Sequence, residues 1–145
     1  MAITQTTCTS FKVELFKAEH DFDAPDTFKI ALYTSSASLD ASTTAYSTAN
    51  EITNTSGTAY QPGGKSLTVA STFPKSIGTT AIVDFNNVSW TNATFTARGA
   101  LIYNSSASNK AVAVLDFGSD RSASASTFEI QFPIAGATSA IIRIT

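Results

Sequence analysis

His20 is the only histidine of the chain, and it stands among three acidic residues, Glu19, Asp21 and Asp23. A hydrolytic enzyme built on this histidine would also need a serine or cysteine that the histidine activates as a nucleophile. The sequence contains neither a Gly-x-Ser-x-Gly elbow nor a reactive-cysteine signature. We therefore interpret His20 as a solvated residue in the last turn of a helix, where the helix dipole favours a cation.

Asp21, Asp23 and Asp26 raise the question of a calcium site, because closely spaced carboxylates are typical of calcium loops. Their spacing departs from the EF-hand pattern, and Pro25 stands where further ligands should follow. A glycosidase would need two carboxylates across a cleft, and the spacing of the eleven acidic residues implies no such pair. The sequence thus predicts a protein that is not an enzyme, with no catalytic residues, no metal and no cofactor.

Aromatic side chains could bind sugar rings, as they do on many β-sandwiches. The candidates are Tyr33, Tyr46, Tyr60, Trp90 and Tyr103. Trp90 and Tyr103 fall in phase with the buried positions of their strands, so we expect them in the core. Tyr46 and Tyr60 are left as candidate partner-binding residues, and their exposure side by side would favour a glycan-binding module.

Arg98 is the one charged residue in a run of Ala, Gly, Leu, Ile and Tyr. An outward side chain that keeps its guanidinium in water is the simple interpretation. If both faces of its strand are covered, however, the cation needs a carboxylate or carbonyl partner. Asp84, Asp116 or an acid of another subunit could supply it, so Arg98 is a further candidate for partner binding.

Composition excludes several classes of partner. The chain has 145 residues, a formal net charge of -2 and only 14% charged residues, so it lacks the basic field of a nucleic-acid-binding surface. No run approaches the ~20 apolar residues of a membrane span, and the N-terminus lacks the pattern of a signal peptide. Cys8 is the only cysteine and can form no intrachain disulfide. We expect synthesis in a cytosol, and neither nucleic acid nor membrane as a partner.

One segment has helical periodicity, because apolar residues recur at i, i+4, i+7 and i+11 after Ser10, which suits the N-cap position. These apolar residues are Phe11, Leu15, Ala18 and Phe22. We predict an amphipathic helix over about residues 10–22. Its apolar stripe, with Phe16 as extra apolar surface beside it, makes Phe11, Leu15 and Phe16 candidate partner-binding residues. The alternative is that the helix only covers the open end of its own sandwich.

The rest of the chain predicts β-structure. Two nearly continuous apolar runs between Thr94 and Phe117 flank a polar loop at residues 105–109, which is the pattern of a β-hairpin. Further strands are predicted at residues 28–32, 66–70, 81–85, 127–132 and 140–145, with long polar loops at residues 34–64 and 118–126. We predict one mainly β domain, residues 1–145: the helix, then an antiparallel, jelly-roll-like β-sandwich of seven or eight strands over about residues 27–145.

The predicted hairpin is apolar on both faces, so it must lie in the middle of a sheet under a covering layer. A chain of 145 residues has limited means to cover it, and a neighbouring subunit is one way to do so. The sequence therefore also predicts a homo-oligomer.

Six segments together resemble a family of small virion structural proteins encoded in tailed-bacteriophage genomes. They are FKIALYTSSASLDASTTAYS, TAYQPGGKSLT, VSWTNATFTARGALIYNSS, KAVAVLDFGSD, FEIQFP and AIIRIT, and the resemblance covers nearly the whole chain from Phe11. It implies a component of the virion, made in the host bacterial cytoplasm. Because small β-rich proteins of such particles commonly serve as decoration or cement proteins, it implies binding to the major capsid protein and to its own copies, with a trimer favoured. The alternative that it leaves open is a tail or fibre module that binds a host receptor or glycan.

Overall fold

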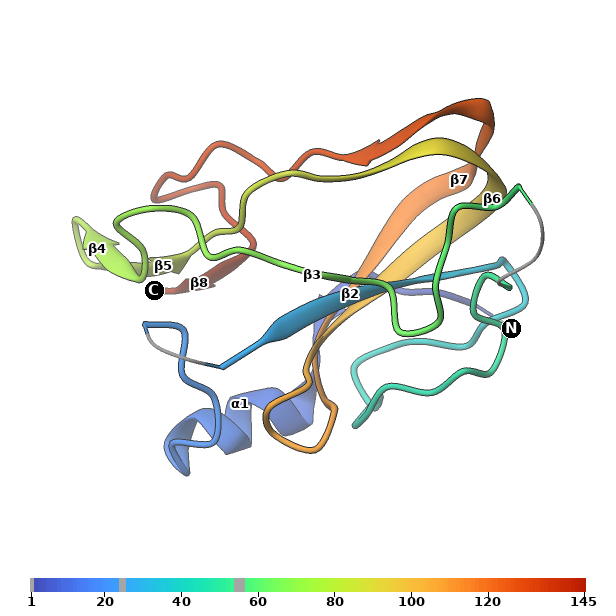
Figure 1. Ribbon diagram of the computed structural model, residues 1–145. Helices are drawn as coiled ribbons and strands as arrows, with labels where there is room; N and C mark the ends of the chain where they lie inside the picture. Colours follow the sequence, from blue (N-terminus) through green and yellow to red (C-terminus); the bar gives the residue numbers. More distant parts are fainter. Residues whose placement is uncertain (1, 24–25, 54–56) are drawn as a thin grey trace.

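The computed structural model describes residues 2–23, 26–53 and 57–145, and in these ranges it is mainly β, with two antiparallel sheets and one short helix (Figure 1). Five strands form the larger sheet in the order β1-β7-β6-β2-β3, and three form the smaller sheet in the order β4-β5-β8. The elements in chain order are β1 (Thr6–Thr7), α1 (Thr9–Phe16), β2 (Phe28–Tyr33), β3 (Lys65–Ser66), β4 (Lys75–Ile77), β5 (Thr80–Val83), β6 (Val88–Asn104), β7 (Lys110–Ile130) and β8 (Ile142–Ile144). No helix in the described ranges is long and apolar enough to cross a membrane.

The predicted hairpin is confirmed. Asn104 of β6 pairs with Lys110 of β7 on either side of the loop at residues 105–109. β6 lies between β7 and β2, so its apolar run occupies the middle of the larger sheet. This is the position expected of a strand that is buried on both faces.

Both hairpin strands are longer than predicted. β6 already begins at Val88, and the polar stretch at residues 118–126 belongs to β7 and is not a loop. Alanine and serine favour strands only weakly, so the stretch looks like a loop in the sequence. Pairing with β6 overrides that preference: Ala123 is buried, and Ser122 Oγ lies 2.7 Å from Thr96 Oγ1 across the ribbon. Four register shifts interrupt the pairing, and such bulges bend a strand. In Figure 1 the paired strands β6 and β7 bend back, so that the start of β6 and the end of β7 lie away from β2.

Helix α1 is shorter than predicted and ends at Phe16 instead of residue 22. Ala18 adopts a φ of 57°, and the amides of Ala18 and Glu19 donate to the carbonyl oxygens of Leu15 and Glu14 at 3.2 and 3.1 Å. This is a Schellman stop, which usually has glycine at the left-handed position. With alanine there, the sequence gives no stop signal. Nor does Ser10 cap the helix, since it lies inside α1.

Phe22 nevertheless joins the core beside Phe11, because the chain turns back after α1. The two rings meet edge to face with centroids 6.0 Å apart, and Phe22 stacks on Phe28 of β2 at 4.3 Å. Of the predicted stripe, Phe11 is buried and Leu15 and Phe22 are partly buried. Ala18 is exposed, so the periodicity was wrong for that residue as well as for the length of the helix.

Three other predicted strands are confirmed as β2, β5 and β8. The strand predicted at residues 66–70 is reduced to β3 and an isolated bridge between Val69 and Phe85, and the one at residues 127–132 merges with β7. The short strands β1 and β4 were not predicted. Trp90 and Tyr103 are 1% and 2% exposed, which confirms them as core residues.

Candidate functional site

Tyr46 and Tyr60, two of the candidate partner-binding residues, meet around a buried carboxylate and not on the surface. Glu51 accepts hydrogen bonds from Tyr46 Oη, Tyr60 Oη and the Gly63 amide, each 2.7 Å long. Tyr60 is 0% exposed and Glu51 7% exposed. The expectation that Tyr60 contacts a partner is therefore wrong, because its ring and hydroxyl are enclosed by the chain itself. Tyr46 is half-buried.

This cluster ties the long segment at residues 34–64 to the larger sheet. Tyr60 Oη accepts from the Leu32 amide of β2 at 2.9 Å, and Tyr103 of β6 donates to the Gly63 carbonyl oxygen at 2.7 Å. Tyr46 also stacks on Tyr103, with ring centroids 4.7 Å apart. The arrangement holds the segment against the sheet.

Burial first, and the neighbouring Glu51 second, raises the pKa of the tyrosines in this cluster. The pKa of Tyr103 rises to about 12, and those of Tyr46 and Tyr60 rise further above the usual range of a phenol. The phenols are therefore protonated at neutral pH and act as hydrogen-bond donors.

The prediction that His20 is solvated is wrong, because its side chain is 0% exposed. Nε2 donates to Glu14 Oε2 at 2.6 Å, and Nδ1 accepts from Asn104 Nδ2 at 3.1 Å. The orientation of the Asn104 amide follows from its other bonds, since Nδ2 also donates to Asp26 and Oδ1 accepts from the Ser106 amide. With both ring nitrogens occupied, His20 has no free nitrogen for general base catalysis. It instead joins the chain after α1 to the hairpin.

The other candidate groups for chemistry, Cys8 and the aspartates after α1, are buried or hydrogen-bonded within the chain. Cys8 is 0% exposed, and burial raises the pKa of its thiol to about 11, so it is not a nucleophile at neutral pH. Asp21 accepts from the Asp23 amide and Asp26 from the Asp21 amide, each at 2.9 Å. Within the described ranges, no group of three His, Cys, Asp or Glu side chains is arranged to hold a metal ion.

Arg98 has a partner within its own chain. Its Nε donates to Asp116 Oδ1 at 3.1 Å, and the two side chains are 34% and 25% exposed. Of the alternatives for Arg98, pairing with Asp116 on the adjacent strand is thus confirmed. A hydrogen bond from the Gly118 amide, and then the Arg98 guanidinium, lower the pKa of Asp116. Arg98 is therefore paired within its own chain, and its contact with a partner stays a prediction.

An apolar surface lies where α1 and β8 come together. Val13, Phe16 and Ile144 are 50%, 94% and 56% exposed, although large apolar side chains are usually buried. Phe16 and Ile144 line a groove of about 610 Å³, together with the two cations Lys12 and Arg143. We name these five residues the α1–β8 surface.

The three helical residues predicted to bind a partner have different environments. Phe16 lies at the surface, and Leu15 is half-buried in the lining of the groove. Phe11 is 1% exposed and its ring contacts that of His20, with centroids 4.9 Å apart, so its prediction as a partner contact is wrong. The helix thus covers its own core through Phe11 and presents Phe16 away from it.

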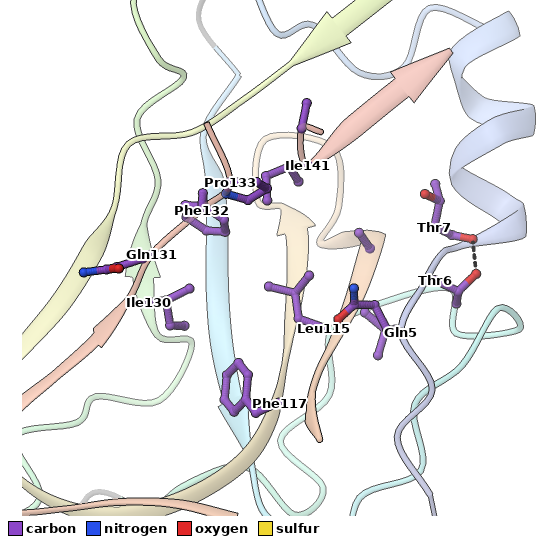
Figure 2. A pocket seen from close by; sticks show the side chains of 13 residues that line it. Gln5, Thr6, Thr7, Leu115, Phe117, Ile130, Gln131, Phe132, Pro133 and Ile141 are labelled. Atoms are coloured by element: carbon purple, nitrogen blue, oxygen red, sulfur yellow. Dashed lines mark hydrogen bonds between the residues drawn. The ribbon is translucent and has the colours of Figure 1, made fainter. Parts of the chain in front are cut away.

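A second groove, of about 400 Å³, lies between the β1–β7 edge of the larger sheet and the chain that follows β7 (Figure 2). Figure 2 shows Gln5 and Leu115 on one side and Ile130 and Phe132 on the other, and Thr7 lines both grooves. None of the described residues that line it is charged, so it suits a neutral ligand better than a phosphate. The sequence could not predict this groove, because it forms where both ends of the bent strand β7 approach each other.

The apolar hairpin is covered by its own chain. Residues Ala100 to Tyr103 are at most 2% exposed, and residues Ala111 to Val114 are at most 4% exposed. Tyr46 stacks on one strand, and α1 contacts the other. The homo-oligomer stays a prediction, but the hairpin no longer supports it.

The chain matches no family model, no curated protein and no solved structure.

Proposed function

We propose that this chain is a structural component of a bacteriophage particle: a capsid decoration protein that binds the major capsid protein through the α1–β8 surface and stabilises the shell. The observation that carries the proposal is Phe16, which is 94% exposed beside an apolar groove, with Val13 on the same helix. Exposed apolar patches with a polar rim are characteristic of interaction sites. The resemblance to virion structural proteins suggests the kind of partner.

Binding is favoured over catalysis by the way the polar groups are used. Glu51 is surrounded by three donors, both nitrogens of His20 are occupied, and Arg98 is paired with Asp116. A catalytic centre needs groups that converge on a space where a reacting atom can sit. Each of these groups instead bonds to other residues of the fold, so we propose a protein without enzymatic activity.

We also infer that the two sheets form a β-sandwich. Buried residues of both sheets belong to one core cluster, for example Ile102 of β6 and Ile142 of β8. Two layers around a shared core are the usual solution for sheets with an apolar face. The strand orders β1-β7-β6-β2-β3 and β4-β5-β8 do not by themselves establish a jelly-roll connectivity.

A decoration protein acts through contact area. Each large apolar side chain that becomes fully buried contributes roughly 1.5–3 kcal/mol, so Phe16, Val13 and Ile144 offer a useful attachment energy. Contacts between the chain and the shell would be lost if the shell expanded further, so they oppose that expansion. We further propose that copies contact each other as a trimer, the number that the resemblance favours.

The second candidate, a tail or fibre module that binds a host receptor or glycan, has less support. It depended on the joint exposure of Tyr46 and Tyr60, and Tyr60 is 0% exposed. The neutral groove of Figure 2 is one place that could accommodate such a ligand.

Replacement of Phe16 by serine tests the proposal, with Ile134→Ser as the matched control. Ile134 is 90% exposed but does not line the α1–β8 groove. We expect both variants to unfold within ~1 kcal/mol of the wild type, because neither removes a buried contact. Only Phe16→Ser should lose occupancy when added to particles that lack the chain, since exposed aromatic anchors dominate interfaces. Equal occupancy of the two variants would contradict the proposal and move the attachment to residues 34–64.

A further inference from the structure

β8 has a free edge beside the apolar groove. It pairs with β5 through Ile142, Arg143 and Ile144, and it ends the order of the smaller sheet, so no described strand pairs with its other side. A free edge presents backbone N–H and C=O groups that a second extended chain can bond. Because residues of α1 and β8 line the same groove, a strand added to β8 would lie along it. Figure 1 shows β8 on the side of β5 that is nearer to α1.

Two cationic side chains also line the groove. Lys12 and Arg143 line it, and neither forms an ion pair with a described residue. Arg143 Nη1 donates to the Ala137 carbonyl oxygen at 3.0 Å. The nearest acid of the helix, Glu14, bonds inward to His20. On a chain of net charge -2, this is a local excess of cations.

We propose that the α1–β8 surface binds an extended segment of a partner protein that carries apolar side chains at alternate positions and carboxylates between them. The segment adds to β8 as a strand. Its apolar side chains enter the groove against Leu15 and Phe16, and its carboxylates meet Lys12 and Arg143. Backbone bonding supplies affinity in this mode, and the pockets and charges supply specificity. The inference rests on the proposed function, because it names the partner segment for the same surface.

A protein segment fits these features better than a lipid surface. Exposed aromatic residues and cations also occur on membrane-binding helices, which insert a protruding apolar face into the interface. Here the apolar residues border a concave groove, and the neighbouring strand offers unpaired backbone groups. A lipid surface cannot use either the concavity or the strand edge.

The test selects displayed random dodecapeptides on the immobilised wild-type chain, with depletion on the Phe16→Ser variant. We expect enriched peptides with net negative charge and apolar residues at every second position. A synthetic copy should slow amide hydrogen exchange at Ile142–Ile144. Lys12→Glu should weaken its binding roughly tenfold, because a cation at the rim becomes an anion. Lys75→Glu is the matched control, because it makes the same charge change on β4, at the opposite edge of the same sheet. It should weaken peptide binding less than about twofold.

Enriched peptides that are basic or lack alternation, or an absence of protection at β8, would overturn the inference. So would an equal loss of affinity in the two charge variants. Vesicles of phosphatidylcholine and phosphatidylserine form a further arm of the test. If the chain binds them through Phe16 and no peptide is enriched, the partner of this surface is a lipid and not a protein segment. If no peptide is enriched while Phe16→Ser still loses particle occupancy, the decoration role is supported and the inference of strand addition is rejected. If peptides bind while occupancy is unaffected, the decoration role falls instead.

Discussion

Glu51 is a buried carboxylate that is held by hydrogen bonds from Tyr46, Tyr60 and the Gly63 amide. A buried charge is costly unless its lone pairs are satisfied, so these donors have a structural purpose. The sequence could identify the tyrosines as unusual but not their partner, since Glu51 lies in a long polar segment without periodicity. The same holds for His20, whose bond to Glu14 spans six residues across a helix stop and follows no helical spacing.

Tyr60→Phe should destabilise the protein more than Tyr46→Phe. The Tyr60 variant leaves the buried Leu32 amide without its acceptor as well as removing a donor to Glu51, so we expect a loss of ~1–3 kcal/mol. The half-buried Tyr46 donates one bond to Glu51, and its loss should cost ~0.5–1.5 kcal/mol. Urea unfolding measures both, and a Tyr46 variant that is the less stable of the two would refute the assignment.

The same tyrosines predict a loss of stability at alkaline pH. Burial raises the pKa of Tyr103 from 10.0 to about 12, and it raises those of Tyr33, Tyr46 and Tyr60 as well. The folded protein keeps protons that the unfolded chain releases near pH 10.0. The free energy of unfolding therefore has its maximum contribution from these tyrosines below that pH and decreases from there towards pH 12. Ultraviolet absorbance and circular dichroism should show tyrosinate and unfolding together. Tyrosinate formation near pH 10.0 with an intact fold would argue against burial.

His20→Ala should cost far more than Lys110→Ala, although both break a pair with a glutamate. His20 is fully buried and its loss leaves Glu14 without its partner, for which we expect roughly 3 kcal/mol. The pair of Lys110 with Glu19 is 34% and 27% exposed, and such pairs contribute less than ~1 kcal/mol. Thermal or urea unfolding compares them, and similar losses would show that the His20 network is not stabilising.

At the scale of the elements, the sequence predicts those strands and helices whose apolar residues alternate or recur at helical spacing. The hairpin, β2, β5 and β8 follow from apolar runs and from spacing, whereas Phe11 was expected at a partner surface and is buried instead. Two features were missed for physical reasons. Ala18 stops α1 in a conformation that usually requires glycine, and the alanine- and serine-rich part of β7 is a strand only because β6 pairs with it.

Ala18→Gly is expected to stabilise the protein by up to ~1 kcal/mol. Alanine at a φ of 57° is strained by its Cβ, and glycine adopts this conformation freely. The Schellman bonds use backbone atoms and are kept. Differential scanning calorimetry should show a higher midpoint, and a lower midpoint would mean that Ala18 is not under strain.

The two faces of α1 should differ strongly in their contribution to stability. Phe11→Ala removes a ring that is 1% exposed, with an expected cost of ~3–5 kcal/mol. Phe16→Ala removes a ring that is 94% exposed, and the free energy of unfolding should change by less than ~0.5 kcal/mol. Chemical unfolding of both variants provides the comparison. A large loss for Phe16→Ala would mean that this ring serves folding and not attachment.

At the scale of the whole molecule, the candidate site is assembled from distant parts of the chain. Phe16 and Lys12 come from the N-terminal helix, and Arg143 and Ile144 come from the last strand. The helical pattern identified Phe16 as apolar surface beside the stripe, but nothing in the sequence indicated that β8 would lie next to it. The decoration role therefore combines a surface found in the fold with a resemblance found in the sequence.

A cryo-electron-microscopy map of the intact phage particle tests this role most directly. We expect density for this chain on the outer face of the capsid, with Phe16 and Ile144 against the major capsid protein. A chain located in the tail or a fibre, or bound to the capsid with the α1–β8 surface facing solvent, would contradict the account.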